Sequence, residues 1–520
     1  MSGSTGDATP GAGSPPPLPP ALADPGPGAP TAPIALAPLP PDAAHLPARR
    51  VEVPDDVVDA LRDVCAEVRA APGELVDASR DWWPLAMTWA AEGRVGQVAS
   101  VLVRPGAPEE VAAVLARCNR ARVPVTVAAG RSGVCGGSVP VHGGVLLDLT
   151  GLRGIRDVDA TSGVVDVAAG TFGDHLEREL RVDHGLTLGH WPQSLALSTV
   201  GGWLACRGAG QFSTRYGKIE DMVVGLDAVL ASGRSVTTGG HAPAAAGPDL
   251  TQVFVGSEGT LGVVTGARLR AWPVPTYERS AAWSFPSFAA GLEACRRVLR
   301  RGATPAVLRL YDDVEAKRSF DLGDRHVLLV HDEGDRAVVD GMWSVVEEEC
   351  AEARSEDPAL VAQWLGHRND VSFLEQLIAE GYLVDTIEVT GRWRDLPRIY
   401  ERAIAALRGL PDIAAASAHQ SHSYPDGACL YFSFGGRPAP DQREARYVEA
   451  WDAVTRAVLA EGGSLSHHHG VGLNRSRFVA EALGEGFSVL AALKQQLDPN
   501  GILNPGKLGL ASPFGAVGWP

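Results

Sequence analysis

The sequence predicts an α+β fold with two domains, and three observations support this prediction. From about residue 100, short apolar strands alternate with amphipathic helices, which is typical of a sheet domain. Three glycine-rich loops fall inside this first stretch. Between about residues 276 and 460 helices and strands follow a different pattern, which predicts a second, α/β domain over the first.

The N-terminal part of the chain precedes these domains. Residues 1–48 are rich in Pro, Ala and Gly, which predicts a disordered tail because such a segment buries too little apolar surface to offset its ordering entropy. Residues 49–96 are assigned to an N-terminal helical segment. Its first helix is expected at 55–71, where apolar residues recur at helical spacing: Val57, Val58, Leu61, Val64, Cys65 and Val68.

The first domain is assigned to residues 97–275 and the second to residues 276–460. In the first we expect a helix at 109–120 and strands at 101–103, 123–127, 144–149 and 163–170. In the second we expect helices at 288–300 and 396–407 and strands at 325–330 and 428–434. Residues 461–510 are assigned to a segment that returns to the first domain, and 511–520 to a tail.

Composition narrows the classes of function. The formal net charge of -16 argues against general nucleic-acid binding, which needs a basic surface. The sequence contains no apolar run of about 18 residues, so no membrane-spanning helix is expected. The N-terminal residues do not have the pattern of a signal peptide. The seven cysteines are scattered without a CxxC pair, so we expect free thiols and a cytoplasmic protein.

The glycine-rich loops predict a site for a phosphate-bearing cofactor. Ala129-Gly130-Arg131-Ser132-Gly133 directly follows a predicted strand, and glycines let backbone N–H groups approach phosphate oxygens. Gly201-Gly202-Trp203 and the run Gly256-Ser257-Glu258-Gly259-Thr260-Leu261-Gly262 are two further clusters. Three loops in one domain favour a dinucleotide over a mononucleotide. Neither a GxGxxG nor a Walker A sequence is present.

Several segments resemble the vanillyl-alcohol oxidase/p-cresol methylhydroxylase (PCMH-type) FAD-binding superfamily. These are the loop from Pro124 to Ser132 followed by Gly136-Gly137, and the segment from Gly256 to Thr265. Three more segments resemble its alkylglycerone-phosphate synthase branch: His190 to Trp203, Tyr216 to Asp221, and Gly462 to Gly472 with its three histidines. The resemblance runs from about residue 97 to 508 and implies a two-subdomain FAD-binding domain with an α/β substrate (cap) domain.

The resemblance also implies where FAD lies and that it is bound non-covalently. The residues expected to hold it are Thr126, Val127, Ala128, Ala129, Gly130, Arg131, Ser132, His190, Gln193, Ser194, Leu195, Ser198, Thr199, Cys206, Arg207, Gly208, Ala209, Glu258, Gly259, Thr260, Leu261, Gly262, Val263 and Val264. Of these, His190 is expected near the flavin ring.

The branch exchanges the acyl group of acyl-dihydroxyacetone phosphate for a fatty alcohol, without net oxidation. By resemblance, Tyr431 is the acid/base residue, and His467, His468 and His469 assist proton transfer, a role that suits histidine because its pKa lies near neutrality. Arg309 matches an arginine important for activity, and Thr386 stands where the family has an active-site serine. The bland alternatives are a core tyrosine, a structural ion pair and hydrogen-bonded structural histidines.

The match departs at the phosphate-binding arginine of that branch, because the corresponding residue is Leu374. Arg368 or the adjacent His367 is the candidate replacement, since arginine suits phosphate. No metal site is expected, because adjacent histidine side chains diverge and no second ligand cluster is evident. A small molecule or lipid is the expected substrate, and a homodimer and peripheral membrane contact are both compatible with this interpretation.

Two rival functions remain open at this point. The first is an FAD-linked dehydrogenase or oxidase of a 2-hydroxy acid such as lactate or glycolate. That branch carries a metal site with an HxGDGNxH-like segment and a Glu-His-Gly sequence, whereas this chain has His419-Gln420-Ser421-His422 and His468-His469-Gly470. The second rival is a flavoprotein that binds its ligand without catalysis, against which the retained histidines and Tyr431 argue.

Overall fold

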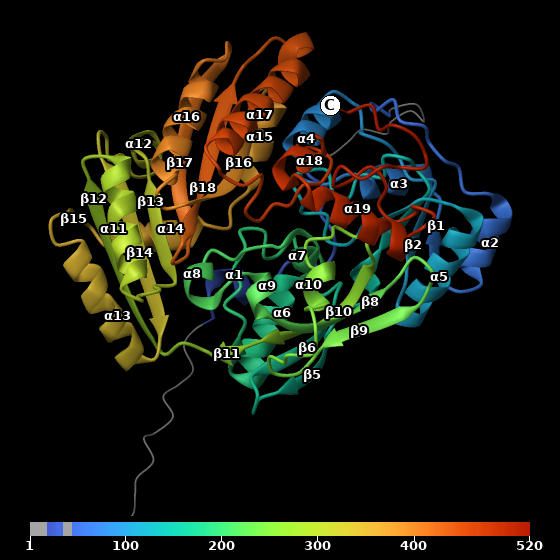
Figure 1. The fold of residues 1–520 in the computed structure, drawn as a ribbon, viewed down its shortest axis with the longest axis horizontal. Helices are drawn as coiled ribbons and strands as arrows, with labels where there is room; N and C mark the ends of the chain where they lie inside the picture. The colour runs from blue at the N-terminus through green and yellow to red at the C-terminus, as the bar shows by residue number, and fades with distance from the viewer. Residues whose placement is uncertain (1–17, 35–43, 520) are drawn as a thin grey trace, which may run out of the picture.

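The computed structural model describes residues 18–34 and 44–519 (Figure 1). Three large sheets organise these residues, together with a two-stranded ribbon of β7 (Leu186–Thr187) and β11 (Trp272–Pro273). In Figure 1 the seven-stranded sheet of the second domain occupies the left and upper part of the view, and the two sheets of the first domain lie below and to the right. The structure confirms the predicted mixed α+β class.

The four-stranded sheet has the order β1-β2-β4-β3, from β1 (Glu67–Arg69), β2 (Val101–Arg104), β3 (Val125–Ala128) and β4 (Val145–Asp148). The pairs β2/β4 and β3/β4 are parallel. The valine- and leucine-rich runs of β2 and β4 are almost completely buried, as expected for parallel strands covered on both faces. Helix α5 (Pro108–Ala121) covers one face with Val111, Val114, Leu115 and Cys118.

The five-stranded sheet has the order β5-β6-β10-β8-β9, and each neighbouring pair of strands is antiparallel. Its strands are β5 (Ile155–Asp159), β6 (Val164–Ala168), β8 (Val223–Val229), β9 (Ser235–Gly239) and β10 (Val263–Arg270). Short helices connect them: α6 (Gly173–Glu179), α7 (Val200–Cys206), α8 (Ser213–Tyr216), α9 (Ile219–Met222) and α10 (Thr251–Phe254).

The chain leaves this sheet at Arg270 and enters the seven-stranded sheet of the second domain at Tyr277. The order is β15-β12-β14-β13-β17-β18-β16, from β12 (Tyr277–Phe285), β13 (Val307–Tyr311), β14 (His326–Gly334), β15 (Arg354–Glu356), β16 (Leu383–Arg392), β17 (Ile413–Ser423) and β18 (Gly427–Gly436). Its helices are α11 (Phe288–Arg300), α12 (Asp313–Phe320), α13 (Arg336–Glu349), α14 (Ala359–His367), α15 (Ser372–Ala379), α16 (Leu396–Arg408) and α17 (Arg443–Ala460).

The C-terminal segment packs back onto the first domain. Helices α18 (Val479–Leu483) and α19 (Gly486–Leu497) lie near the centre of Figure 1, among elements of the N-terminal half. The buried Lys494 ammonium donates to the Thr260 carbonyl and to Asp498. Leu503 pairs with Val125 at the edge of β3. The chain therefore brings a C-terminal residue next to the first residue of β3.

Two expectations about the N-terminal part are wrong. Helix α2 (Asp55–Arg62) ends early, and the residues after it form β1, which pairs antiparallel with β2. Sheet pairing thus overrides the apolar helical spacing between 63 and 71. Residues 18–34 are placed against the folded domains, with a short helix α1 (Pro20–Ala23) and a fully buried Leu22 in the core of the first domain. Residues 1–17 and 35–43 of the predicted tail lie outside the described residues.

Helices α3 (Pro72–Ala78) and α4 (Pro84–Ala91) complete the segment before β2. Among the described residues, no helix combines the length and apolar character needed to cross a bilayer.

Candidate active site

A cavity of about 530 Å³ lies between the first domain and the seven-stranded sheet. Its first-domain walls come from the loop after β3, helix α7 and the loop before β10. Strands β13, β16, β17 and β18 and the loop after α17 supply the opposite wall. The cavity therefore joins the three predicted glycine-rich loops to the predicted catalytic tyrosine and histidines.

The loop after β3 is built to receive phosphate oxygens. Within residues 18–34 and 44–519, no backbone N–H from Gly130 to Gly137 donates to another protein group. Backbone N–H groups held in a structured loop are normally paired, so this unpaired set points to an external acceptor. Gly130 is required by close approach, because a Cβ there would stand 2.2 Å from the Leu197 carbonyl oxygen. These residues fit a dinucleotide pyrophosphate.

Most of the predicted cofactor residues line this cavity. They are Val127, Ala128, Ala129, Gly130, Arg131, Ser132, Gln193, Ser194, Ser198, Thr199, Cys206, Gly208, Ala209, Glu258, Gly259, Gly262, Val263 and Val264. Arg131 adopts a left-handed φ of 57° and donates to the Ala78 carbonyl oxygen. Its side chain is thus turned toward α3.

Six predicted cofactor residues do not line the cavity: Thr126, His190, Leu195, Arg207, Thr260 and Leu261. Among them, His190 has a buried ring that packs on Trp203 at a centroid distance of 4.5 Å. Burial, with the nearby Lys218, lowers the pKa of His190 to about 3. The neutral His190 imidazole thus lies outside the cavity lining, packed on the ring of Trp203, which does line the cavity.

Tyr431 of β18 lines the second-domain wall of the cavity. Its hydroxyl accepts a hydrogen bond from Thr386 Oγ1 at 3.0 Å, across the register of β16 and β18. The His419 ring stacks on the tyrosine ring at 4.8 Å, and the rings of His468 and His469 lie at 6.1 and 5.6 Å. Burial raises the pKa of Tyr431, so the phenol keeps its proton at neutral pH.

A buried carboxylate, Glu388 of β16, holds the triple-histidine loop in place. It accepts hydrogen bonds from the backbone N–H of His467 at 2.5 Å and of His469 at 2.8 Å, and from Arg475 at 3.0 Å. Burial acts to raise the pKa of Glu388, but Arg475 and His469 outweigh it and hold the pKa below its ordinary value. From the first domain, Glu258 accepts from the N–H groups of Val471 and Gly472.

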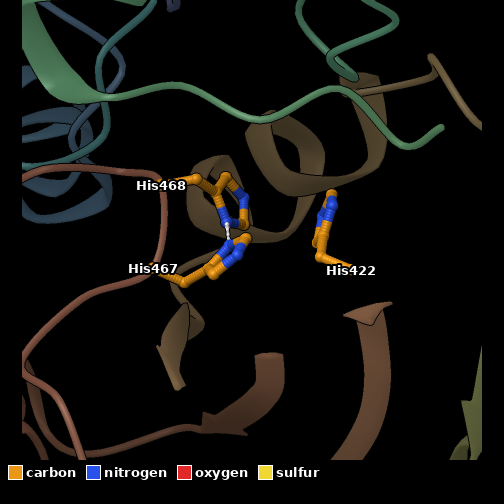
Figure 2. Close-up of side chains that lie close together, drawn as sticks. All are labelled: His422, His467 and His468. Atoms are coloured by element: carbon orange, nitrogen blue, oxygen red, sulfur yellow. Dashed lines mark hydrogen bonds between the residues drawn. The ribbon is translucent and has the colours of Figure 1, made fainter. Parts of the chain in front are cut away.

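Two histidines of this loop lie close together and close to a third histidine from β17. Figure 2 shows His467 and His468 side by side, joined through their Nδ1 atoms at 2.9 Å, with His422 of β17 facing them. One ligand-capable atom from each of these three residues lies within 4.8 Å of the others. Burial lowers the pKa of all three, which keeps them neutral. The expectation that no ligand cluster exists is therefore wrong, and this trio could accept a transition-metal ion.

The strand position of His422 explains its orientation. The residue has a left-handed φ of 51° at a bulge in β17, where the register shifts between Ser421 and Ser423. Bulges re-aim side chains and are frequent next to active sites. The imidazole Nδ1 contacts Ser213 Oγ at 2.7 Å, and His467 Nε2 contacts the Tyr424 hydroxyl at 2.8 Å. His467 itself does not line the cavity but contacts His468, which does.

The other predicted site residues do not all line the cavity. Arg309 and Thr386 line the cavity, but Arg368 does not. The Arg368 guanidinium packs against the rings of Trp191 and Phe212 at 5.1 and 4.7 Å, and donates to Gln211 Oε1. Arg368 thus lies in an aromatic cage outside the cavity lining.

Leu374 lines the cavity instead and packs in an apolar cluster. Its neighbours in that cluster come from the N-terminal segment, the loops of the first domain and β16: Ile34, Trp82, Met87, Val134, Leu197, Val371, Ile378 and Val384. This wall of the cavity suits an apolar group.

Sequence reasoning missed His419, His422, Glu315, Asp385 and Glu388 as site residues. Asp385 lines the cavity and accepts from the Tyr447 hydroxyl at 2.6 Å, while burial raises its pKa to about 7. The alternation of the β17–β18 hairpin could have found His419, because it is paired directly with Tyr431. No local pattern marks Glu388, whose role depends on a loop far along the chain.

Comparisons with known proteins agree with this geometry. Residues 99–239 match the FAD binding domain family, and residues 274–508 match the C-terminal domain of FAD linked oxidases. The uncharacterized FAD-linked oxidoreductase YgcU of Escherichia coli (strain K12) is 31% identical over 432 residues, which cover 79% of this chain and 89% of that protein. The alkyldihydroxyacetonephosphate synthase of Dictyostelium discoideum is 29% identical over 460 residues, 80% of this chain and 74% of the relative.

Other relatives carry oxidoreductase names. The glycolate oxidase subunit GlcD of Bacillus subtilis (strain 168) is 28% identical over 434 residues, with 78% of this chain and 88% of the relative covered. A solved structure of alkyldihydroxyacetonephosphate synthase superposes with a TM-score of 0.74 at 24% identity, over 92% of this chain and 89% of that chain. This structural likeness supports the fold. The chain belongs to the FAD-linked oxidase family with a PCMH-type FAD-binding domain, and it is an FAD-dependent enzyme of that family.

Proposed function

We propose that this enzyme exchanges the acyl group of an acyl-dihydroxyacetone-phosphate-like substrate for a fatty alcohol, in the manner of alkylglycerone-phosphate synthase. The observation that carries the proposal is the surrounding of Tyr431, whose hydroxyl contacts Thr386 while three histidine rings lie around it. FAD, when bound, supplies an electrophilic ring that can hold the substrate carbon. We further propose that FAD is bound non-covalently, so that denaturation should release free flavin.

The chain's own groups are arranged for proton transfer at one carbon. The Tyr431 phenol, protonated because burial raises its pKa, can donate a proton to a departing oxygen. The neutral imidazoles of His468 and His469 can accept a proton from the substrate carbon. Thr386 directs the phenol hydroxyl, and Glu388 fixes the histidine loop through its backbone N–H groups.

A second candidate is the flavin-linked oxidation of a 2-hydroxy acid. The apolar cluster around Leu374 favours it, because this wall offers no cation to a substrate phosphate. The names of relatives add support, since they include glycolate oxidase subunit GlcD and the D-lactate dehydrogenase of Arabidopsis thaliana at 26% identity. In this case a histidine of the loop takes the hydroxyl proton.

The visible flavin spectrum of the FAD-loaded enzyme distinguishes the two. Under anaerobic conditions a panel of 2-hydroxy acids should leave an exchange enzyme oxidised, and acyl-dihydroxyacetone phosphate with a fatty alcohol should then yield an ether product and a free fatty acid. Lasting bleaching by one hydroxy acid would replace the exchange by the oxidation. No ether product and no bleaching would reject both.

A further inference from the structure

Arg309 carries a positive charge at the cavity wall that no carboxylate neutralises directly. Only two arginines line the cavity among the described residues, Arg131 in the glycine loop and Arg309 beside Tyr431. Within that part of the chain, Arg309 forms no ion pair. Its recorded hydrogen-bond partners are the neutral Tyr311 hydroxyl and His419 Nε2, each at 2.7 Å. A half-buried guanidinium with this surrounding is suited to an external anion.

A Glu–His pair holds this guanidinium from behind. Because guanidinium only donates hydrogen bonds, His419 Nε2 must accept, and the ring proton must then lie on Nδ1. That Nδ1–H faces Glu315 Oε1 at 3.0 Å, and the carboxylate accepts its hydrogen bond. Burial, together with Arg309, lowers the pKa of His419 to about 4, so the neutral tautomer required by this chain of contacts persists at neutral pH.

The same contacts fix where the remaining N–H groups point. The rings of Tyr311 and Trp364 lie 5.1 and 5.6 Å from the guanidinium carbon and limit its rotation. Nε and one hydrogen of Nη2 are used by Tyr311 and His419, which leaves Nη1 and the second Nη2 hydrogen for the cavity. His419 also stacks on Tyr431, so the free edge of Arg309 lies next to the acid/base residue.

We propose that Glu315 and His419 are positioning residues that direct Arg309 toward the cavity, where its guanidinium binds one carboxylate group of a molecule with an apolar body. The apolar body follows from the apolar part of the same cavity lining, which contains Leu374, Val371 and Leu197. The inference rests on the proposed function in identifying that carboxylate: it is the fatty acid released in the exchange, or the acid group of a hydroxy acid in the oxidation.

Calorimetric titration of the FAD-loaded enzyme with octanoate and with octan-1-ol tests the proposal without turnover. The wild type should bind octanoate more tightly than the alcohol. Arg309→Met should weaken octanoate binding roughly 10- to 100-fold, the range expected for a lost charge-assisted hydrogen bond. His419→Ala should lose a large part of this affinity, and His419→Gln, which can still present an acceptor, should recover it. Octan-1-ol affinity should stay unchanged in all three.

Arg325→Met is the matched control, because Arg325 bonds Ser284 outside the cavity. Equal binding of octanoate and octan-1-ol by the wild type would overturn the anion subsite. Wild-type octanoate affinity in both His419→Ala and Glu315→Gln would overturn the positioning role. Flavin absorbance and circular dichroism of each variant separate these outcomes from misfolding. A negative result in this binding assay leaves the flavin-spectrum and ether-product results standing, so the two proposals fail separately.

Discussion

Tyr431 is the residue whose loss should affect chemistry most directly. Tyr431→Phe keeps the ring that stacks on His419 but removes the hydroxyl that contacts Thr386. Turnover should fall by roughly two to four orders of magnitude, the usual contribution of a general acid, while the FAD content stays constant. Steady-state rates and the flavin absorbance measure both. Tyr277→Phe, which removes a hydroxyl bonded to Asp340 on the far edge of the sheet, is the control; equal rates in both variants would exclude Tyr431 as the acid.

The lowered pKa values of the loop histidines predict how kcat changes on the acid side of its pH profile. Burial lowers the pKa of His469 to about 4 and those of His467 and His468 well below 6.5. A lowered pKa means that the neutral, proton-accepting form persists as the pH falls through 6.5. The kcat of Asp385→Asn, which removes the cavity carboxyl whose pKa is raised to about 7, should therefore stay flat between pH 8 and roughly pH 5. An acid limb centred near 6.5 would show that these imidazoles titrate like exposed ones.

At the scale of an element, the loop after β3 owes its shape to glycine. Gly130→Trp should lower the FAD content of the purified protein, because even a Cβ at this position meets the Leu197 carbonyl at 2.2 Å. The flavin-to-protein absorbance ratio measures occupancy. Gly106→Trp is the control, since a Cβ there meets nothing within 4 Å and the residue does not line the cavity. Full occupancy in Gly130→Trp would contradict the placement of the pyrophosphate.

The triple-histidine loop predicts a stability effect at Glu388. Glu388→Ala leaves the buried Arg475 without its partner, which should cost about 3–5 kcal/mol of unfolding free energy. The exposed pair of Glu481 and Arg456 provides the control, and Glu481→Ala should cost less than about 1 kcal/mol. Urea unfolding followed by tryptophan fluorescence compares the two. Similar midpoints for both variants would mean that Glu388 does not anchor the loop.

Local patterns predicted the elements well and the long-range contacts poorly. Helix α11 occupies its expected residues 288–300, and the strands around 101, 125, 145 and 428 are present. The expected helix does not continue after Arg62, because residues 67–69 pair with β2 instead. This pairing is a tertiary contact that the local apolar spacing does not reveal. The resemblance pointed to Tyr431 and the histidine loop, and Tyr431, His468 and His469 line one cavity. It did not identify Glu388, Glu315 or His419, because their roles arise only when separate strands meet in one sheet.

At the scale of the whole molecule, the Pro-rich N-terminal segment contributes to the fold. Leu22 is fully buried among residues of the first-domain core, and Arg178 donates to its carbonyl oxygen. Leu22→Ala should lower the free energy of unfolding by about 2–5 kcal/mol, as for other buried leucines. Leu250→Ala should have almost no effect, since Leu250 is 59% exposed. Equal stability of the two variants by urea unfolding would mean that the segment detaches in solution.

The two carboxylates that grip residues 467–472 come from different domains. Glu258 precedes β10 in the first domain, and Glu388 belongs to β16 in the second. In a recombinant protein whose two domains come from different parents, this loop would therefore be held by one carboxylate from each parent. A chimera that exchanges the cap domain alone would pair a native loop with a foreign anchor. Exchange of residues 277–478 together, with a glutamate retained at position 258, keeps both carboxylate contacts of the loop.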